Sequence, residues 1–305
     1  MKLLTYADAR GARIAVLAEN EGRNRFIDIA DTDPDLPSEM RSLLALGQSV
    51  SERRRVADKL SHIQATGFGF APDTVQLLPP VPDPSKILCI GLNYVDHARE
   101  TGAAIPSEPV IFNKLPGALL HHGGIIRLPG VSRRVDYEAE LVLVIGKQGR
   151  DIAEENALEH VAGYCCGNDV SARDWQKEKP AGQWFLGKTF DTFAPTGPYL
   201  VTADEIGDPG NLELTLRLNG RVMQHSNTNQ FIFPIPKLIA YVSQVCTLTP
   251  GDLIFTGTPA GVGDSRNPPS YLQPGQTLEV EIERVGILRN RVERAQAGNG
   301  VPGVF

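Results

Sequence analysis

The sequence predicts an α+β protein in which a small N-terminal α/β domain precedes a larger, strand-rich domain. Candidate strands follow one another without the regular alternation of strand and helix that parallel α/β folds require. The 30 glycines and 23 prolines make up about 17% of the 305 residues, against a usual value of about 12%, which disfavours long helical bundles. With 22% charged residues, the remaining composition is typical of a globular protein.

The N-terminal domain is expected to span residues 1–70. Short apolar runs separated by turn residues predict three strands, at Leu3–Tyr6, Ile14–Leu17 and Phe26–Ile29. Two helices are expected at Ser38–Leu46 and Ser51–Ile63, each with its first serine placed to cap the helix.

A proline-rich segment, residues 71–85, follows this domain and contains five prolines. We interpret it as a linker to a second domain, residues 86–305. Apolar runs predict seven strands in that domain, at Lys86–Ile90, Val110–Asn113, Glu140–Ile145, Gly163–Gly167, Leu212–Leu218, Leu253–Thr256 and Thr277–Glu283. Helices are expected at Asn156–His160 and Lys237–Gln244.

Charge and motif content argue against several classes of protein. The net charge of −6 disfavours a nucleic-acid partner, and no apolar run has the 18 or so residues needed to cross a membrane. Neither G-x-G-x-x-G nor a P-loop is present, so a nucleotide cofactor is not indicated. The four cysteines form no C-x-x-C pair, which favours a reduced, cytoplasmic setting.

Three carboxylates stand beside predicted strands. Glu138 and Glu140 are two residues apart, so their side chains point to the same face, and Asp169 follows another apolar run. Three oxygen ligands would suit Mg²⁺ or Mn²⁺ better than zinc. The spacing alone also fits two glutamates facing water on an edge strand and an aspartate near a helix N-terminus.

A histidine and a glutamate lie three residues apart in a short predicted helix. Asn93 is placed to cap this helix, and Gly102 to end it. His97 and Glu100 then share one face, where the carboxylate would orient the imidazole and raise its basicity, as a base that activates water requires. A surface ion pair of little energetic consequence has the same spacing.

Two further segments contain groups that would bind an anion. Lys188 lies among aromatic residues and glycines, where a buried lysine needs an anion such as a substrate carboxylate or a developing enolate. Extension to the surface is the alternative. At residues 251–263 a strand runs into a turn rich in glycine and threonine, whose backbone N–H groups would suit an anion, although such turns are common.

Five motifs follow one another over about residues 86–283: G-L-N-Y-x-x-H-x-x-E, Y-E-x-E-L, N-D-V-S-A-R-D-W-Q, G-K-T-F-D-T-F-x-P-x-G-P and G-D-L-I-x-T-G-T-P-x-G-V-G. In this order they resemble the fumarylacetoacetate hydrolase family, and most of all its smaller members, the fumarylacetoacetate hydrolase domain-containing proteins. The segment 226–230 adds to the likeness. The resemblance implies the family's mixed β-sandwich roll for the second domain, a divalent metal, a 2-keto-acid-like substrate and a homodimer.

Site residues also follow from the resemblance, motif by motif. The implied Mg²⁺ ligands, with Mn²⁺ as the alternative ion, are Glu138, Glu140 and Asp169. The implied catalytic residues are His97, Glu100 and Lys188. The implied substrate contacts are Lys114, Arg173, Gln176, Lys188 and Thr258. Residues 91–94 supply no carboxylate where the larger founding hydrolase has an extra aspartate ligand, so substrate or water is expected to complete the coordination.

The function first expected from these residues is hydrolytic C–C cleavage of an acylpyruvate or related 2,4-diketo acid. The 2-keto acid would chelate the metal, His97 held by Glu100 would deprotonate water, and Lys188 with the metal would stabilise the pyruvate enolate that leaves. The alternative is an oxaloacetate decarboxylase or keto–enol tautomerase that uses the same site. A third hypothesis, a catalytically silent protein that binds a keto acid or a protein partner, fits the intact set of residues less well.

Overall fold

The apolar run at residues 141–145 forms part of strand β10 (Ala139–Ile145), whose seven residues are all buried. The strand is covered on both faces, because Leu141 and Leu143 belong to one hydrophobic core while Val142 and Val144 belong to another. Side chains alternate across a strand, so covering both faces accounts for an apolar run without interruption.

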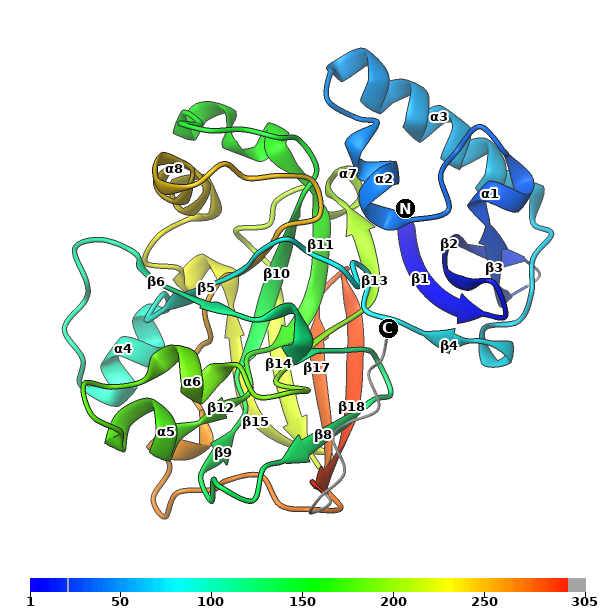
Figure 1. Ribbon diagram of the computed structural model, residues 1–305. Helices are drawn as coiled ribbons and strands as arrows, with labels where there is room; N and C mark the ends of the chain where they lie inside the picture. The colour runs from blue at the N-terminus through cyan, green and yellow to red at the C-terminus, as the bar shows by residue number, and fades with distance from the viewer. Residues whose placement is uncertain (21, 296–305) are drawn as a thin grey trace.

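The computed structural model describes residues 1–20 and 22–295, so the last ten residues of the predicted second domain lie outside it (Figure 1). Within these residues, eleven strands form one large sheet. Its main path is β3 (Arg23–Asp28), β2 (Gly11–Asn20), β1 (Lys2–Asp8), β13 (Ala194–Thr202), β11 (Val161–Asn168), β10, β16 (Leu253–Phe255), β5 (Ile87–Gly91) and β6 (Val110–Lys114). Two short strands join it at the side, β4 (Gln76–Leu77) and β7 (Leu119–Leu120).

A five-stranded sheet packs on the middle of the large one. Its order is β15 (Arg221–Asn227), β14 (Glu213–Leu218), β17 (Thr277–Ile282), β18 (Gly286–Arg294) and β8 (Ile125–Leu128). A further pair consists of β9 (Val135–Asp136) and β12 (Ser171–Ala172). The core between the two sheets includes Leu143 of β10, Leu216 of β14 and Val280 of β17. This packing forms a β-sandwich with helices outside it, which confirms the predicted α+β class.

Short helices cover the outer faces and ends of the sheets. The α-helices are α1 (Ile29–Thr32), α2 (Met40–Ala45), α3 (Val50–Thr66), α4 (Val95–Thr101), α5 (Arg173–Glu178), α6 (Trp184–Lys188), α7 (Ala203–Ile206) and α8 (Ile235–Val245). The 3₁₀ helices are η1 (Pro72–Thr74), η2 (Pro116–Ala118), η3 (Glu154–His160), η4 (Thr228–Gln230) and η5 (Gly263–Ser265). Figure 1 shows α4, α5 and α6 grouped on the side of the molecule away from β1–β3. Among the described residues, no helix is long and apolar enough to cross a membrane.

Strand β1 joins the N-terminal strands to the rest of the large sheet. It pairs antiparallel with β13, with Leu3 opposite Leu200 (Figure 1). The second hydrophobic core contains residues from both sides of this junction, including Leu3, Ile14 and Val142. The sheet is therefore continuous across the predicted linker, and the division of the chain at residues 71–85 stays a prediction.

The ten strands predicted from apolar runs are present, with ends that differ by a few residues. Four longer strands were not predicted: β8, β13, β15 and β18. The pattern for β13 is interrupted by Pro195, Gly197 and Pro198, and β15 and β18 carry mostly polar residues. Pairing with neighbouring strands, which local sequence does not show, places these segments in the sheets.

The predicted helix caps were wrong at three positions. Ser49, not Ser51, caps α3 and forms a capping box with Glu52. The residue that caps α2 is Glu39, and its side chain makes no capping hydrogen bond, so Ser38 has no such role. Asn93 does not cap α4, where Tyr94 occupies that position. The Asn93 amide is buried and bonds to the backbone of the chain segments beside α4, which satisfies three backbone groups there.

Candidate metal centre and active site

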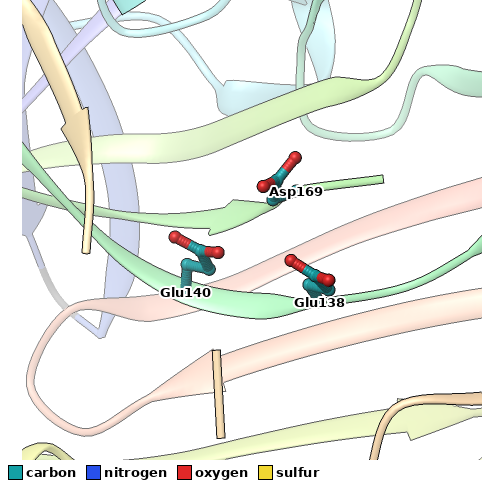
Figure 2. Close-up of side chains that lie close together, drawn as sticks. All are labelled: Glu138, Glu140 and Asp169. Atoms are coloured by element: carbon teal, nitrogen blue, oxygen red, sulfur yellow. The ribbon is translucent and has the colours of Figure 1, made fainter. Parts of the chain in front are cut away.

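Three buried carboxylates meet where β10 begins and β11 ends. Glu138 immediately precedes β10, Glu140 is the second residue of that strand, and Asp169 follows the last residue of β11. The backbone N–H of Asp169 donates to the carbonyl of Glu138 at 2.9 Å, which extends the pairing of the two strands to this point. One oxygen of each carboxylate lies within 4.8 Å of the others, and Figure 2 shows the three side chains gathered around one space.

Two cations contact this group of carboxylates. Lys188 Nζ lies 2.8 Å from Glu138 Oε2 and 2.8 Å from Asp169 Oδ2, and Arg173 Nη1 lies 2.7 Å from Glu138 Oε1. Burial alone would raise the pKa of Glu138, but the charges of Lys188 and Arg173 lower it to about 2. The anion that a buried Lys188 requires is therefore supplied by two of the three carboxylates.

Glu140 has a different environment. It is 1% exposed, and among the described residues no lysine, arginine or histidine forms an ion pair with it. One of its oxygens accepts a hydrogen bond of 2.8 Å from the backbone N–H of Gly257. Burial and the neighbouring charges of Asp169 and Glu138 raise the pKa of Glu140 well above its usual range. The ionised form of Glu140 is costly here unless a cation joins the group.

These residues fit a hard divalent cation. The donor set consists of carboxylate oxygens, which are the ligands that such cations prefer, and the three donor atoms are close enough to converge on one ion. Each carboxylate oxygen can accept more than one contact, so the ion pairs with Lys188 and Arg173 leave acceptor capacity for a metal. The group is a possible carboxylate metal site, and a cation there would relieve the repulsion at Glu140.

Helix α4 places the predicted histidine–glutamate pair. His97 Nδ1 lies 3.2 Å from Glu100 Oε2, and the other oxygen of Glu100 accepts a hydrogen bond of 2.8 Å from the backbone N–H of Gly261. Gly261 has a φ of +103°, and a Cβ there would lie 2.2 Å from the carbonyl oxygen of Met223, so the turn requires glycine. Glu100 is thus fixed at both oxygens, and it orients the imidazole.

A cavity of about 220 Å³ lies between α4, α5 and α6. Among its lining residues are six of the predicted site residues, namely His97, Glu138, Arg173, Gln176, Lys188 and Thr258. Apolar and aromatic side chains complete the wall, including Ile90, Phe112 and Trp184. The structure therefore brings the histidine, the lysine and one of the carboxylates to a single small cavity.

The predicted substrate contacts differ in the donors they offer. Arg173 Nη1 donates to Gln176 Oε1 at 3.0 Å and Nε donates to Asp136 Oδ2 at 2.9 Å, while Nη2 lies 2.8 Å from Asp136 in an ion pair without a hydrogen bond. The amide nitrogen of Gln176 has no hydrogen-bond partner among residues 1–20 and 22–295, which leaves a donor for a substrate oxygen. Thr258 donates its hydroxyl hydrogen to the carbonyl of Ala139 at 2.9 Å, so it faces the cavity only as an acceptor or through its methyl group.

Lys114 lies behind the site. Its ammonium group donates to the carbonyls of Val170 at 3.1 Å, Phe193 at 2.8 Å and Lys188, and it lies 2.6 Å from Asp169 Oδ1. The side chain is fully buried and does not line the cavity. The structure gives no support to the predicted substrate contact of Lys114 and assigns it the support of Asp169 instead.

Sequence reasoning missed several residues that hold the site together. Asp136 is fully buried, accepts a hydrogen bond of 2.9 Å from Arg173 Nε, and accepts the backbone N–H of Gly263 at 2.8 Å. Arg173 Nη2 lies 2.8 Å from the same carboxylate in an ion pair. Asn168 Oδ1 accepts the backbone N–H of Glu138 at 3.0 Å. Asp136 immediately precedes the Y-E-x-E-L motif that contains Glu138, and that position was the signal in the sequence that pointed to it.

The fold and site define an α+β protein in which a group of buried carboxylates suited to a metal faces a histidine–glutamate pair. The chain belongs to the fumarylacetoacetate hydrolase family, since the family model described as fumarylacetoacetate (FAA) hydrolase C-terminal matches residues 86–293. The resemblance seen in the order of the motifs is thereby confirmed.

Members of this family with similar sequences and structures are named for different reactions. Oxaloacetate tautomerase fahd2, mitochondrial, of Xenopus laevis is 45% identical over 96% of this chain and 90% of its own length. Fumarylacetoacetate hydrolase of Exiguobacterium antarcticum has a TM-score of 0.79 and 34% identity over 97% of this chain and 100% of its own. A 2-hydroxyhepta-2,4-diene-1,7-dioate isomerase of Mycobacterium marinum has a TM-score of 0.75 and 33% identity, with coverage of 98% and 100%.

Proposed function

We propose that the protein is a Mg²⁺-dependent tautomerase that interconverts the keto and enol forms of oxaloacetate or a closely related 2-keto dicarboxylate. The observation that carries the proposal is the single cavity shared by His97, Lys188 and Glu138, which is one of the three grouped carboxylates. The name of the amphibian relative supports the reaction, at 45% identity over nearly the whole chain. This reaction was the alternative hypothesis from the sequence, and it now takes first place.

Glu138, Glu140 and Asp169 would hold the ion. A bound Mg²⁺ would polarise the C2 carbonyl of a keto acid and lower the energy of negative charge on its oxygen. Mg²⁺ is chosen over zinc because all three ligands are carboxylates, and Mn²⁺ is the expected substitute.

The charges around the site favour an anionic substrate once a divalent cation is present. Four buried carboxylates, those of Asp136, Glu138, Glu140 and Asp169, face three buried cations, those of Lys114, Arg173 and Lys188. The protein alone therefore has one negative charge in excess, and a divalent ion converts this to one positive charge. The one carboxylate that adjoins the 2-keto group of the substrate would balance that excess.

The protein's own groups would move the proton. Since His97 Nδ1 contacts Glu100, its Nε2 is the nitrogen available to take a proton from C3 of the keto form. Negative charge then develops on the C2 oxygen, where the ammonium group of Lys188 would stabilise it. Delivery of a proton to that oxygen completes the enol, so the reaction moves one proton from carbon to oxygen and breaks no C–C bond.

Hydrolytic C–C cleavage remains a second candidate function. The histidine–glutamate pair is the arrangement that activates water, and the similar structure from Exiguobacterium antarcticum is a fumarylacetoacetate hydrolase. Oxaloacetate decarboxylation would use the same cavity. These reactions differ from tautomerisation in their products, because each breaks a C–C bond.

The experiment that tests the proposal compares substrates on one metal-loaded preparation. Keto–enol interconversion of oxaloacetate is followed by ultraviolet absorbance, release of CO₂ from oxaloacetate is measured in parallel, and acetylpyruvate cleavage is followed by product analysis. We expect tautomerisation to be the fastest reaction, to stop with chelator, and to fall by about 10²–10⁴ in His97→Ala. Faster cleavage of acetylpyruvate, or tautomerisation that His97→Ala leaves unchanged, would overturn it.

We also propose, from the family resemblance, that the protein acts as a homodimer, and, from its four free cysteines, that it resides in the cytoplasm. The amphibian relative is named as mitochondrial, so cell fractionation separates the two locations. Light scattering of the purified protein measures its oligomeric state directly, and a monomer would contradict the proposed dimer.

A further inference from the structure

Helix α4, which carries His97, has two carboxylates that accept hydrogen bonds from elsewhere in the fold. Asp96 Oδ2 accepts a hydrogen bond of 2.6 Å from the hydroxyl of Ser226, and Asp96 Oδ1 accepts one of 3.3 Å from the backbone N–H of Ala260. Glu100 makes the third contact, with Gly261. The helix has seven residues and no side-chain cap at Tyr94, so its position depends on such tertiary contacts.

The hydroxyl that contacts Asp96 comes from a strand that also contacts the carboxylate group. Ser226 lies on β15, two residues after Gln224, and residues two apart on a strand point to the same face. Gln224 is 1% exposed; its Oε1 accepts the backbone N–H of Ala139 at 2.9 Å, and its Nε2 donates to Thr258 Oγ1 at 2.8 Å. Ala139 is the residue between the predicted ligands Glu138 and Glu140.

The end of β15 therefore connects the two halves of the site. Through Gln224 it is bonded to the strand that presents the carboxylates, and through Ser226 it is bonded to the helix that presents His97. β15 belongs to the five-stranded sheet, whereas β10 belongs to the large sheet. The position of the imidazole relative to the carboxylates is thus set across the packing of the two sheets.

We propose that Asp96 and Ser226 are positioning residues, whose hydrogen bond holds His97 at the place where it exchanges a proton with the substrate. The inference deepens the proposed function and rests on it, because it assumes that His97 moves the proton. A hydrogen bond to a carboxylate at 2.6 Å is among the strong ones, and proton transfer is sensitive to small displacements of the base. It also gives a role to the first residue of the segment 226–230, which the predicted functions did not use.

A purely local role for Asp96 makes a different prediction. An acidic residue in the first turn of a helix is stabilised by the helix dipole, and that interaction needs no partner on β15. If the dipole were the whole role, Ser226→Ala would leave catalysis unchanged. If the hydrogen bond positions the helix, Ser226→Ala and Asp96→Ala would have similar effects, and the double variant would be little worse than either one.

The test measures Ser226→Ala, Asp96→Ala and their combination in the Mg²⁺-loaded protein. We expect kcat for oxaloacetate tautomerisation to fall about 10- to 100-fold in each single variant and no further in the double variant. KM and the Mg²⁺ affinity from titration calorimetry should stay within about twofold, because neither residue contacts the cavity or the carboxylates. Ser226→Thr keeps the hydroxyl and should retain most of the activity.

Two readouts separate positioning from general damage. The isotope effect of C3-deuterated oxaloacetate should rise in the variants, because a displaced base makes proton transfer more rate-limiting. Hydrogen–deuterium exchange of the α4 amides should become faster, while exchange in β10 and β11 is unchanged. The matched control is Ser85→Ala, which removes a serine–aspartate hydrogen bond of 2.5 Å to Asp252, and it should change neither readout.

The outcomes distinguish this inference from the proposed function. Unchanged kcat and unchanged α4 exchange in Ser226→Ala would overturn the inference, whatever the reaction is. Wild-type protein that does not tautomerise oxaloacetate would overturn the proposed function. Faster α4 exchange in the variants, with a parallel loss of acetylpyruvate cleavage, would then still support the positioning role for that reaction.

Discussion

Replacement of Glu140 by glutamine should have opposite effects on the protein with and without metal. Gln is nearly isosteric, and its amide oxygen can still accept the hydrogen bond of 2.8 Å from the backbone of Gly257. The substitution removes a buried negative charge that lies beside Glu138 and Asp169. We therefore expect Glu140→Gln to be more stable than wild type when chelator is present and to lose most of the stabilisation that Mg²⁺ confers.

The distances between the carboxylates give the size of the first effect, the higher stability of Glu140→Gln in chelator. Two unit charges 4.8 Å apart repel by about 3.5 kcal/mol at an effective dielectric constant of about 20. Glu140 has two such neighbours, but Lys188 lies 2.8 Å from each of them and offsets most of that repulsion. We expect a net gain of about 1–2 kcal/mol at neutral pH, which corresponds to a higher melting temperature by at most a few degrees for a chain of this length.

The pH dependence gives, by an independent route, the sign of the stability difference between Glu140→Gln and wild type without metal. The pKa of Glu140 is raised in the folded protein, so wild type without metal loses stability as pH rises from the unfolded pKa, about 4.3, through the folded pKa. Glutamine does not titrate. The advantage of Glu140→Gln should therefore be absent below about pH 4 and grow as the pH rises.

The second effect is a smaller stabilisation by Mg²⁺, which we expect because Glu140→Gln binds the ion more weakly. At a Mg²⁺ concentration 100 times the wild-type Kd, binding stabilises the folded protein by about 2.7 kcal/mol. Loss of a ligand should lower the affinity by about 100-fold or more, since residues that only support ligands already contribute 10- to 100-fold. The stabilisation of Glu140→Gln at that concentration should then be about 0.4 kcal/mol or less.

Scanning calorimetry in chelator and in Mg²⁺ measures both effects on one preparation. Glu279→Gln is the matched control, because it replaces a strand glutamate that pairs with Arg289 at 2.7 Å near the surface. That variant should lose no more than about 1 kcal/mol and should keep the full Mg²⁺ effect. A Glu140→Gln protein that is less stable than wild type in chelator, yet fully stabilised by Mg²⁺, would refute the electrostatic reasoning.

Two further predictions concern buried charges. Lys114→Met should cost about 3–5 kcal/mol in urea denaturation, because it leaves Asp169 and three backbone carbonyls without the buried ammonium group that they contact. A loss below about 1 kcal/mol would contradict the support assigned to Lys114. At the end of strand β3, burial alone would raise the pKa of Asp28, but hydrogen bonds from Arg13 and Tyr6 lower it. A lowered pKa contributes stability above the unfolded value of about 3.9 that is lost as the pH falls, so Asp28→Asn should be destabilising at pH 7 and not in strong acid; an equal loss at both pH values would contradict this mechanism.

Local sequence patterns were sufficient to predict the strands and the side-chain pairs whose members lie within a few residues of one another. The apolar run at residues 141–145 predicted the strand that the structure contains as β10, and the spacing of Glu138 and Glu140 placed their side chains on one face. The spacing of His97 and Glu100 likewise predicted the contact that the structure contains. The same patterns left the role of each group open until the order of the motifs was considered.

Contacts between distant segments were beyond these patterns. The anion for Lys188 was expected to be a substrate, but the structure supplies Glu138, which is 50 residues away. Lys114 was expected in the cavity, but β6 places it behind Asp169. The caps predicted for α2, α3 and α4 were wrong by one or two residues, because capping depends on the backbone conformation of the residues before the helix.

The sequence by itself determined the α+β class, the family and the three carboxylates. Periodicity is a property of neighbouring residues, and the order of the motifs is read directly along the chain. Only the tertiary structure decided which charge neutralises which and what holds the base in place. Asp96 and Ser226 are 130 residues apart, and they meet because two sheets pack with β15 against the start of β10. Strand order and register set such distances, and the local sequence around Asp96 or Ser226 predicts neither of them.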